Sequence, residues 1–155
     1  MNMLFLPMAF CAGVAVTLQT TLNGQLAKGI GGDSVIAALF SFIAGAGLLA
    51  GVALLRGGVA MPLAAIPSQP AWMLAGGLLG ACALLSNVLL APKIGLSSLL
   101  GLVIAGQLLS SLLIDHFALF GSTYRPVSWV KLGGSLLMLA GLAISLFGDR
   151  LFKGA

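Results

Sequence analysis

The chain has 155 residues, of which 60% are hydrophobic and 6% are charged, and its formal net charge is +4. So few charged side chains cannot cover the surface of a water-soluble fold, and the lipid bilayer is therefore the expected solvent. Seven Lys and Arg residues outnumber three Asp residues, but no basic run or row of aromatic residues predicts nucleic-acid binding. The positive charge instead indicates anchoring at the headgroups of anionic lipids.

Five long stretches without charge, or nearly so, predict five membrane-spanning helices, because a helix crosses the hydrocarbon layer with about 20 apolar residues. The expected spans cover residues 3–27, 34–55, 71–92, 95–119 and 127–148. The connection between the second and third spans cannot form one continuous helix, because it contains Pro62, Pro67 and Pro70. We therefore expect an all-α integral membrane protein with a single five-helix domain over residues 1–155.

Small residues recur at helical spacing along the expected spans. In lipid, helices associate where small residues let their backbones approach closely. The second span aligns Ala37, Ser41 and Gly45 on one line, and it places Gly47 and Gly51 on another. Similar stripes occur in four of the spans, so we expect a tightly packed bundle with partners on more than one face.

The basic residues give the chain almost no preferred orientation. With five spans, three of them lie on one side of the membrane and four on the other: Arg56, Arg125 and Lys131 against Lys28, Lys93, Arg150 and Lys153. Lys/Arg asymmetry normally sets orientation, so a chain without it is expected to insert both ways. Two inverted copies would form an antiparallel homodimer of ten helices, the counterpart of an inverted repeat. The alternative is a single orientation set weakly by the basic residues of the tail.

Polar side chains at membrane depth are the candidates for substrate binding. Six lie in three of the spans: Gln19, Thr20 and Asn23 in the first, Asn87 in the third, and Gln107 and Ser111 in the fourth. Such groups are costly in hydrocarbon unless they meet each other, water or a substrate. The spacing of those in the first and fourth spans aligns them on stripes, which favours a polar cavity lined by spans 1, 3 and 4. The alternative is hydrogen bonding between helices, worth about 0.6–2 kcal/mol per contact.

Asp115 and His116, near the end of the fourth span, are the candidates for proton coupling. Asp115 is the one carboxylate outside an evident connecting or terminal segment. The negative end of the helix dipole disfavours its charge there, and it would suit proton exchange with a substrate. The alternative is an interfacial anchor, in which Asp115 pairs with Arg125 or Lys131.

Enzyme chemistry is not expected. One His, no Glu and no Cys/His cluster leave no acid–base pair and no metal site. We expect no cofactor, no metal and no catalytic residue.

Several short motifs along the whole chain resemble those of the YdcZ-type family, a five-helix branch of the bacterial drug/metabolite transporter superfamily. These motifs are Gly13-x5-Gln19-x3-Asn23-x2-Leu26, Phe42-x2-Gly45, Trp72 before Gly76-Gly77-x2-Gly80, Pro92-Lys93-Ile94-Gly95, Gly106-Gln107, and Asp115-His116-Phe117. One departure is Ala118, where the family pattern has Gly after the Phe. It bears on the local geometry of the helix end.

The resemblance implies a multi-pass protein of the bacterial inner membrane, related to ten-helix exporters built from two inverted five-helix halves. It names no substrate. Four-helix multidrug exporters of the same superfamily use a membrane-embedded Glu in the first helix, whereas this chain offers the neutral Gln19. Export of a neutral, zwitterionic or anionic metabolite is therefore favoured over export of a hydrophobic cation.

The expected function is small-molecule transport by alternating access in a homodimer. Two alternatives remain at this point. The chain could be a non-transporting membrane subunit that packs against a larger partner, or a lipid-handling protein of the flippase kind.

Overall fold

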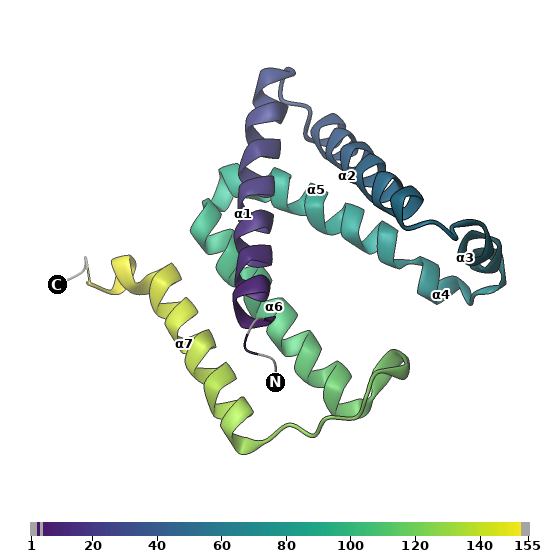
Figure 1. Cartoon of the computed structure of the whole chain (residues 1–155). Coiled ribbons are helices and arrows are strands. Elements are labelled where there is room, and N and C mark those ends of the chain that lie inside the picture. Colours follow the sequence, from purple (N-terminus) through teal and green to yellow (C-terminus); the bar gives the residue numbers. More distant parts are fainter. Residues whose placement is uncertain (1–2, 4, 153–155) are drawn as a thin grey trace. The chain divides into compact units, whose positions relative to one another are not determined.

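The computed structural model describes residue 3 and residues 5–152, with the side chains of these residues except Met61 and residues 149–152. All regular structure in this part of the chain is helical (Figure 1). In chain order the elements are α1 (Phe5–Gly29), α2 (Ser34–Arg56), α3 (Ala60–Ala65), η1 (Ile66–Ser68), α4 (Ala71–Leu74), α5 (Gly76–Ile94), α6 (Leu96–Phe117), η2 (Leu119–Gly121) and α7 (Trp129–Phe152).

Five helical segments among the described residues are long and apolar enough to cross a membrane. They are Phe5–Gly29, Ser34–Arg56, Ala71–Ile94, Leu96–Phe117 and Trp129–Gly148. The prediction of an all-α protein with five membrane-spanning helices is therefore confirmed. The antiparallel dimer and the single domain stay predictions.

The third span is divided into α4 and α5 at Ala75. The Ala75 amide donates to the carbonyl oxygen of Trp72 at 3.3 Å, which tightens the turn. Gly76 and Gly77 follow directly, and glycine is the poorest helix former after proline. The span then continues through Pro92 and ends at Ile94. Pro92 is tolerated because a proline in the last turn disturbs few helical hydrogen bonds.

The connection between α2 and α4 is broken into short pieces, as its prolines predict. The helix α3 covers six residues and η1 covers three. Pro67 lies in the first turn of η1, and Pro70 precedes α4 as its N-cap residue. Sequence analysis did not anticipate the short helix α3.

The chain forms two compact units, Met1–Lys93 and Ile94–Ala155. The first contains α1 to α5, and the second contains α6, η2 and α7. The core of the first unit is a small cluster from α1, α2 and α5, made of Ala27, Ala37, Ala38, Leu84 and Val88. Alanine at three of these five positions lets the α1 and α2 backbones approach closely.

A tight turn joins α1 to α2 and fixes their antiparallel arrangement. Gly31 and Gly32 adopt φ angles of +87° and +91°, which glycine tolerates without steric cost. The Gly32 amide donates to the Ala27 carbonyl oxygen at 2.7 Å, which closes the end of α1. Asp33 then caps α2, because its Oδ1 accepts from the amides of Val35 and Ile36 at 2.9 and 3.0 Å.

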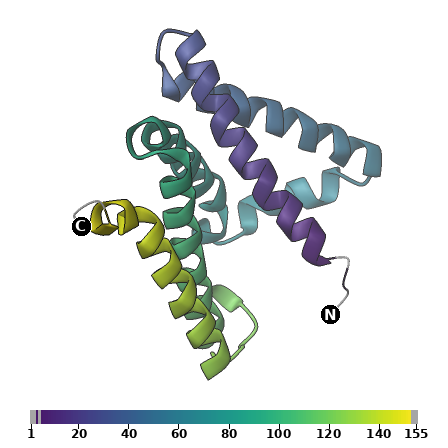
Figure 2. The same cartoon turned by 90° about the vertical axis from the view of Figure 1, so that its left-hand side faces the viewer.

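In the second unit, α6 and α7 pack as an antiparallel pair (Figure 2). Gly101 of α6 lies against α7, where an added Cβ would overlap the Cδ1 atom of the Leu142 side chain. A larger residue at this position would therefore require the flexible Leu142 side chain to shift. The contact is steric, which is how helices associate in lipid.

Close packing along every small-residue stripe does not occur within the units. An added Cβ at Gly45, Gly47 or Gly51 of α2 would meet no other atom within 4 Å, and the same holds at Gly13 and Gly141. Within each unit these glycines are therefore not covered by a neighbouring helix. The prediction of packing on several faces of each helix stays a prediction.

Candidate substrate-binding groove

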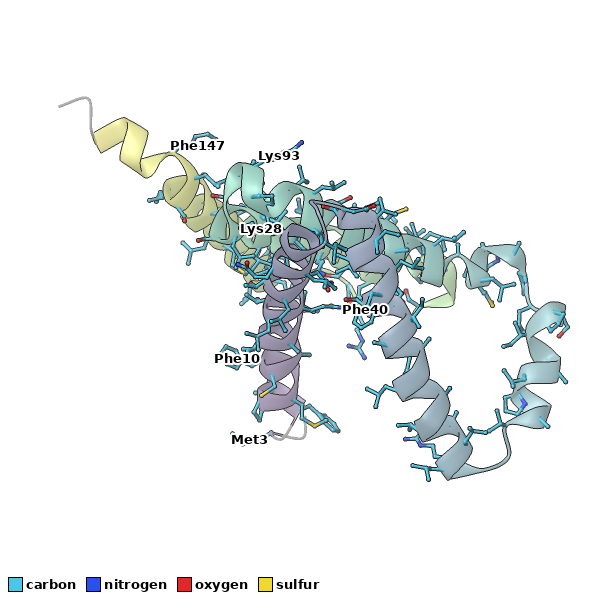
Figure 3. All side chains as sticks on the ribbon, turned by 90° about the horizontal axis from the view of Figure 1, so that it is seen from above. Met3, Phe10, Lys28, Phe40, Lys93 and Phe147 are labelled. Carbon is cyan, nitrogen blue, oxygen red and sulfur yellow. The ribbon has the colours of Figure 1, made fainter. Side chains whose placement is uncertain are left out.

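A groove of about 530 Å³ runs along α1 and α2 of the first unit. It is lined by Ala15, Leu18, Gln19, Leu22, Asn23 and Leu26 of α1 and by Phe40 and Ser41 of α2. Figure 3 shows Phe40 between the two helices. No charged side chain lines the groove, and three carboxamide or hydroxyl groups are set among apolar ones. Two of the predicted site residues, Gln19 and Asn23, thus share one surface.

Asn23 is the most constrained polar residue of this groove. Its side chain is 4% exposed. The Ser41 hydroxyl of α2 donates a short hydrogen bond to its Oδ1. The two residues meet because Ser41 lies one turn beyond Ala37, on the face of α2 that packs against α1. This bond joins the two helices at membrane depth.

The amide nitrogen of Asn23 is buried and has no hydrogen-bond partner among the described residues. Exchanging the oxygen and nitrogen of the carboxamide would not help, because Ser41 offers one hydroxyl and the other atom would then be unpaired. An unpaired buried donor costs about 1–3 kcal/mol. A hydrogen-bond acceptor that reaches the Asn23 amide nitrogen would therefore be bound favourably.

The other polar residues of α1 differ from Asn23 in their surroundings. Thr20 is 1% exposed, but its hydroxyl donates to the Val16 carbonyl oxygen of its own helix at 3.0 Å. That bond satisfies the hydroxyl without any second helix. Gln19 is exposed at the groove surface. Of these two, Gln19 is the one whose polar atoms can reach a molecule in the groove.

Asn87 of α5 is 9% exposed and lies between the core residues Leu84 and Val88 in sequence. It does not line the groove of α1 and α2. The structure therefore places Gln19, Thr20, Asn23 and Asn87 in the first unit, but it joins only Gln19 and Asn23 in one groove.

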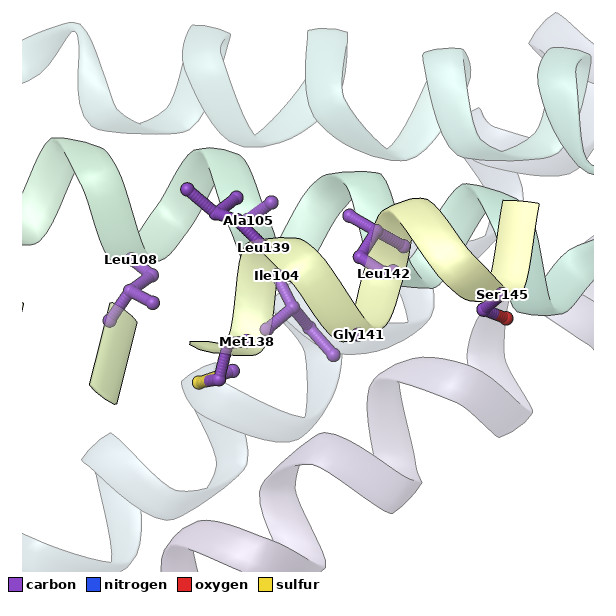
Figure 4. A pocket seen from close by; sticks show the side chains of 9 residues that line it. Ile104, Ala105, Leu108, Met138, Leu139, Gly141, Leu142 and Ser145 are labelled. Carbon is purple, nitrogen blue, oxygen red and sulfur yellow. The ribbon is translucent and has the colours of Figure 1, made fainter. Parts of the chain in front are cut away.

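The predicted residues of the fourth span lie in the second unit. Gln107 and Ser111 are exposed on α6, and the Ser111 hydroxyl donates to the Leu108 carbonyl oxygen of the same helix at 2.8 Å. A separate groove of about 270 Å³ lies between α6 and α7, and neither residue lines it. Figure 4 shows that its walls are apolar, with Ser145 as the one polar side chain. A cavity shared by Asn23, Asn87 and Gln107 stays a prediction.

Asp115 and His116 lie in the last turn of α6, where the following loop folds back onto the helix end. The Arg125 amide donates to the Asp115 carbonyl oxygen at 2.9 Å, and the Ser122 hydroxyl donates to that of Ile114 at 3.1 Å. The His116 Nδ1 accepts from the Val127 amide at 3.4 Å. The first two bonds satisfy carbonyl groups that a helix end otherwise leaves unpaired, and the third holds the His116 ring against the loop.

The return loop contains two strained residues. Ala118 caps α6 in the left-handed conformation, with φ +49° and ψ +39°, and Phe120 has φ +55°. Left-handed backbone costs a residue with a side chain about 1–2 kcal/mol. Ala118 is the position where the resemblance leads us to expect Gly, and Gly adopts the left-handed conformation without this cost.

The predicted ion pair between Asp115 and Arg125 or Lys131 does not form among the described side chains. The contact that exists joins the Arg125 backbone amide to the Asp115 backbone carbonyl. The Asp115 side chain is half-buried. The loop therefore holds the end of α6 through its backbone and leaves the carboxylate out of the contact.

Sequence analysis missed Ser41 and Phe40 as groove residues. Ser41 was assigned to helix packing only, although its place on the Ala37–Gly45 line is what turns it towards α1. A polar residue on a small-residue line, opposite an Asn in the neighbouring span, is the signal that could have identified the pair.

No group of three or more His, Cys, Asp or Glu side chains gathers in the described part of the chain.

The chain matches a protein-family model, described as "Putative inner membrane exporter, YdcZ", over residues 4–144. No curated protein and no solved structure matches the chain. The family is one of membrane exporters and not of enzymes. With five apolar helices long enough to span a bilayer, the chain is a multi-pass inner membrane protein. It belongs to the YdcZ family of inner membrane exporters.

Proposed function

We propose that the chain exports a small molecule through the groove between α1 and α2. The observation that carries this proposal is the Asn23 carboxamide, which is buried and has an amide nitrogen without a partner. A structural asparagine in lipid is expected to use all its hydrogen-bonding atoms, because each unpaired one is costly. A transporter that opens and closes around a substrate leaves such an atom unpaired in one of its states.

The substrate of this groove carries no net positive charge. No carboxylate lines the groove to pair with a cation, and its polar atoms belong to two carboxamides and one hydroxyl. Carboxamides donate and accept hydrogen bonds without charge. The apolar wall of leucines, together with Phe40, suits the apolar part of the same molecule.

The working unit is an antiparallel homodimer, in which a second copy is inverted in the membrane. The near balance of basic residues supports this arrangement, because neither side of the membrane attracts the chain more strongly. In such a dimer the polar residues of α6 from one copy, Gln107 and Ser111, and Asn87 of α5 complete a cavity begun by α1. Rocking of the two halves opens the cavity to either side in turn, which is alternating access.

Proton coupling, where it occurs, is assigned to Asp115 with His116. Asp115 is half-buried and makes no ion pair with the described residues, so its charge is not committed to an anchor. If it couples protons to export, Asp115→Asn reduces transport and alters its pH dependence while the dimer stays intact. Transport that is unchanged at every pH would remove Asp115 from the mechanism.

The experiment is a transport assay on purified protein in liposomes, with solutes first selected by thermal shift from a library of uncharged, anionic and cationic compounds. We expect uncharged or anionic solutes to stabilise and cross, and Asn23→Leu to lower the rate about tenfold, as loss of one hydrogen bond predicts. Thr21→Ala, on the opposite side of α1, is the matched control. Stabilisation without transport would favour a non-transporting subunit, and movement of phospholipid instead of solutes would favour a flippase.

Orientation is tested separately with C-terminal reporter fusions, one active in the cytoplasm and one outside it. Signal from both reporters supports the inverted dimer. Signal from one alone contradicts it.

A further inference from the structure

A second groove lies at the C-terminal end of α2, away from the α1–α2 turn. The helix ends at Arg56, and the chain then reverses into α3 (Figure 1). Gly57 and Gly58 make the reversal possible, because both adopt positive φ angles, +72° and +69°. The reversal brings α3 and η1 back beside the last turns of α2.

The groove between these segments has a volume of about 470 Å³ and mixes one cation with an apolar wall. Leu49 and Val52 of α2 face Leu63 of α3 and Ile66 of η1 across it, and Arg56 lies on its edge. No other charged residue lines it. Arg56 is exposed and makes no ion pair with the described side chains, so its guanidinium is open to an anion from outside this part of the chain.

The length and charge pattern of α2 lead us to expect this groove at the boundary between hydrocarbon and lipid headgroups. The 23 residues of α2 rise about 1.5 Å each and so cover the hydrocarbon thickness of about 30 Å. Residues 34–55 carry no charge, and Arg56 is the first cation after them. A ligand of this groove therefore has an apolar part at hydrocarbon depth and an anionic part at headgroup depth.

We propose that this groove binds one anionic phospholipid. The phosphate lies on the Arg56 guanidinium, whose planar fork can donate two parallel hydrogen bonds to phosphate oxygens. One acyl chain follows the wall formed by Leu49, Val52, Leu63 and Ile66. The site is independent of the substrate groove, which shares none of these residues.

The chain offers a matched control for the charge. Arg125 is an exposed arginine in another connection, and with five crossings it lies on the same side of the membrane as Arg56. It does not line this groove. Removing Arg56 or Arg125 lowers the net charge equally, so only a defined site distinguishes the two variants.

The test is native mass spectrometry of the purified full-length protein with phosphatidylglycerol, phosphatidylcholine or inorganic phosphate as the probe. We expect the wild type to retain phosphatidylglycerol about fivefold to tenfold more strongly than phosphatidylcholine. Arg56→Gln should abolish the preference, Arg56→Lys should reduce it, and Arg125→Gln should leave it unchanged. Leu63→Asn should weaken lipid retention while the charge stays the same.

Three results would overturn the proposal. They are a preference that survives Arg56→Gln, an equal loss in Arg125→Gln, and competition by inorganic phosphate as effective as that by the lipid. The Arg56→Lys variant keeps the proposal testable if Arg56→Gln fails to fold. Lysine keeps the positive charge but cannot donate two parallel hydrogen bonds to phosphate, so an unchanged preference in Arg56→Lys would contradict bidentate binding.

Discussion

The helix pair α1–α2 and the helix pair α6–α7 are joined in opposite ways. In the first, a polar contact between Asn23 and Ser41 crosses the interface beside small alanines. In the second, Gly101 lies against the Leu142 side chain, and the groove between the helices has apolar walls apart from Ser145. The first pair leaves a buried donor unpaired, whereas the second satisfies packing alone.

The loops that connect the two helix pairs also differ in their backbone strain. The α1–α2 turn uses glycines at both positive φ positions and an Asp33 cap, so its backbone is relaxed. The α6–α7 loop places Ala118 and Phe120 in left-handed conformations and holds them by hydrogen bonds to the end of α6. The comparison teaches that strain sits in the interface of the first pair and in the loop of the second. In the proposed binding groove the unfavourable feature is the unpaired amide nitrogen of Asn23. Near Asp115 and His116 it is the left-handed backbone of the loop that follows α6.

The largest effect is expected at the contact between α6 and α7. Gly101→Ala should be less stable than Gly106→Ala by about 1–3 kcal/mol, because Leu142 must shift to admit the new Cβ while both variants gain the same helix propensity. Unfolding of purified protein in mixed micelles measures this. Gly106→Ala on the same helix is the control, since an added Cβ there meets no atom within 4 Å. If Leu142→Ala does not relieve part of the loss, the overlap is not its cause.

Substitutions at the Asn23–Ser41 contact between α1 and α2 should change stability less, and their effects should not be additive. Ser41→Ala alone should cost about 1–2 kcal/mol, because both polar atoms of Asn23 are then unpaired. Combining it with Asn23→Leu should restore stability to near the wild-type value, since neither position then leaves an unpaired polar group. The same unfolding assay on both single variants and the double variant gives the coupling. Additive losses would show that the two side chains do not interact.

The cap of α2 is expected to contribute about 1 kcal/mol. Asp33→Ala removes the acceptor for the amides of Val35 and Ile36 and should lower stability by that amount, whereas Asp33→Asn should retain most of it. Equal losses in the two variants would assign the effect to charge and not to capping.

The smallest effect is a gain at the strained loop. Ala118→Gly should raise the free energy of unfolding by up to about 1 kcal/mol, because glycine adopts the left-handed cap without a Cβ clash. Ala140→Gly, in the middle of α7, is the opposite control and should destabilise by helix propensity. A loss of stability in Ala118→Gly would mean that the cap is not left-handed in the membrane.

The long helices were predictable from sequence because hydrophobic length and the absence of charge are local properties. The break at Ala75 and the short helix α3 were not, since they depend on turn geometry within a stretch that is apolar throughout. The departure at Ala118 was visible as a missing glycine, and its meaning needed the left-handed backbone.

The site was predictable in part. Gln19 and Asn23 stood out as carboxamides one turn apart, and the structure gives them a common groove. Ser41 and Phe40 could not be assigned from composition, because a serine or phenylalanine in an apolar helix has many uses. Which stripe of α2 meets α1 is set by the turn at Gly31 and Gly32, and a hydropathy pattern does not contain that information.

The central claim is that the α1–α2 groove is a water-accessible path, and cysteine labelling tests it most directly. Gln19→Cys and Thr21→Cys are compared in a background without Cys11 and Cys82, which are both free and exposed. Only an ionised thiol reacts quickly, so a thiol facing lipid is protected. Thr21 is exposed about 200° around α1 from Gln19. The account predicts that a small water-soluble thiol reagent labels Gln19→Cys several-fold faster than Thr21→Cys, and equal protection of both would contradict it.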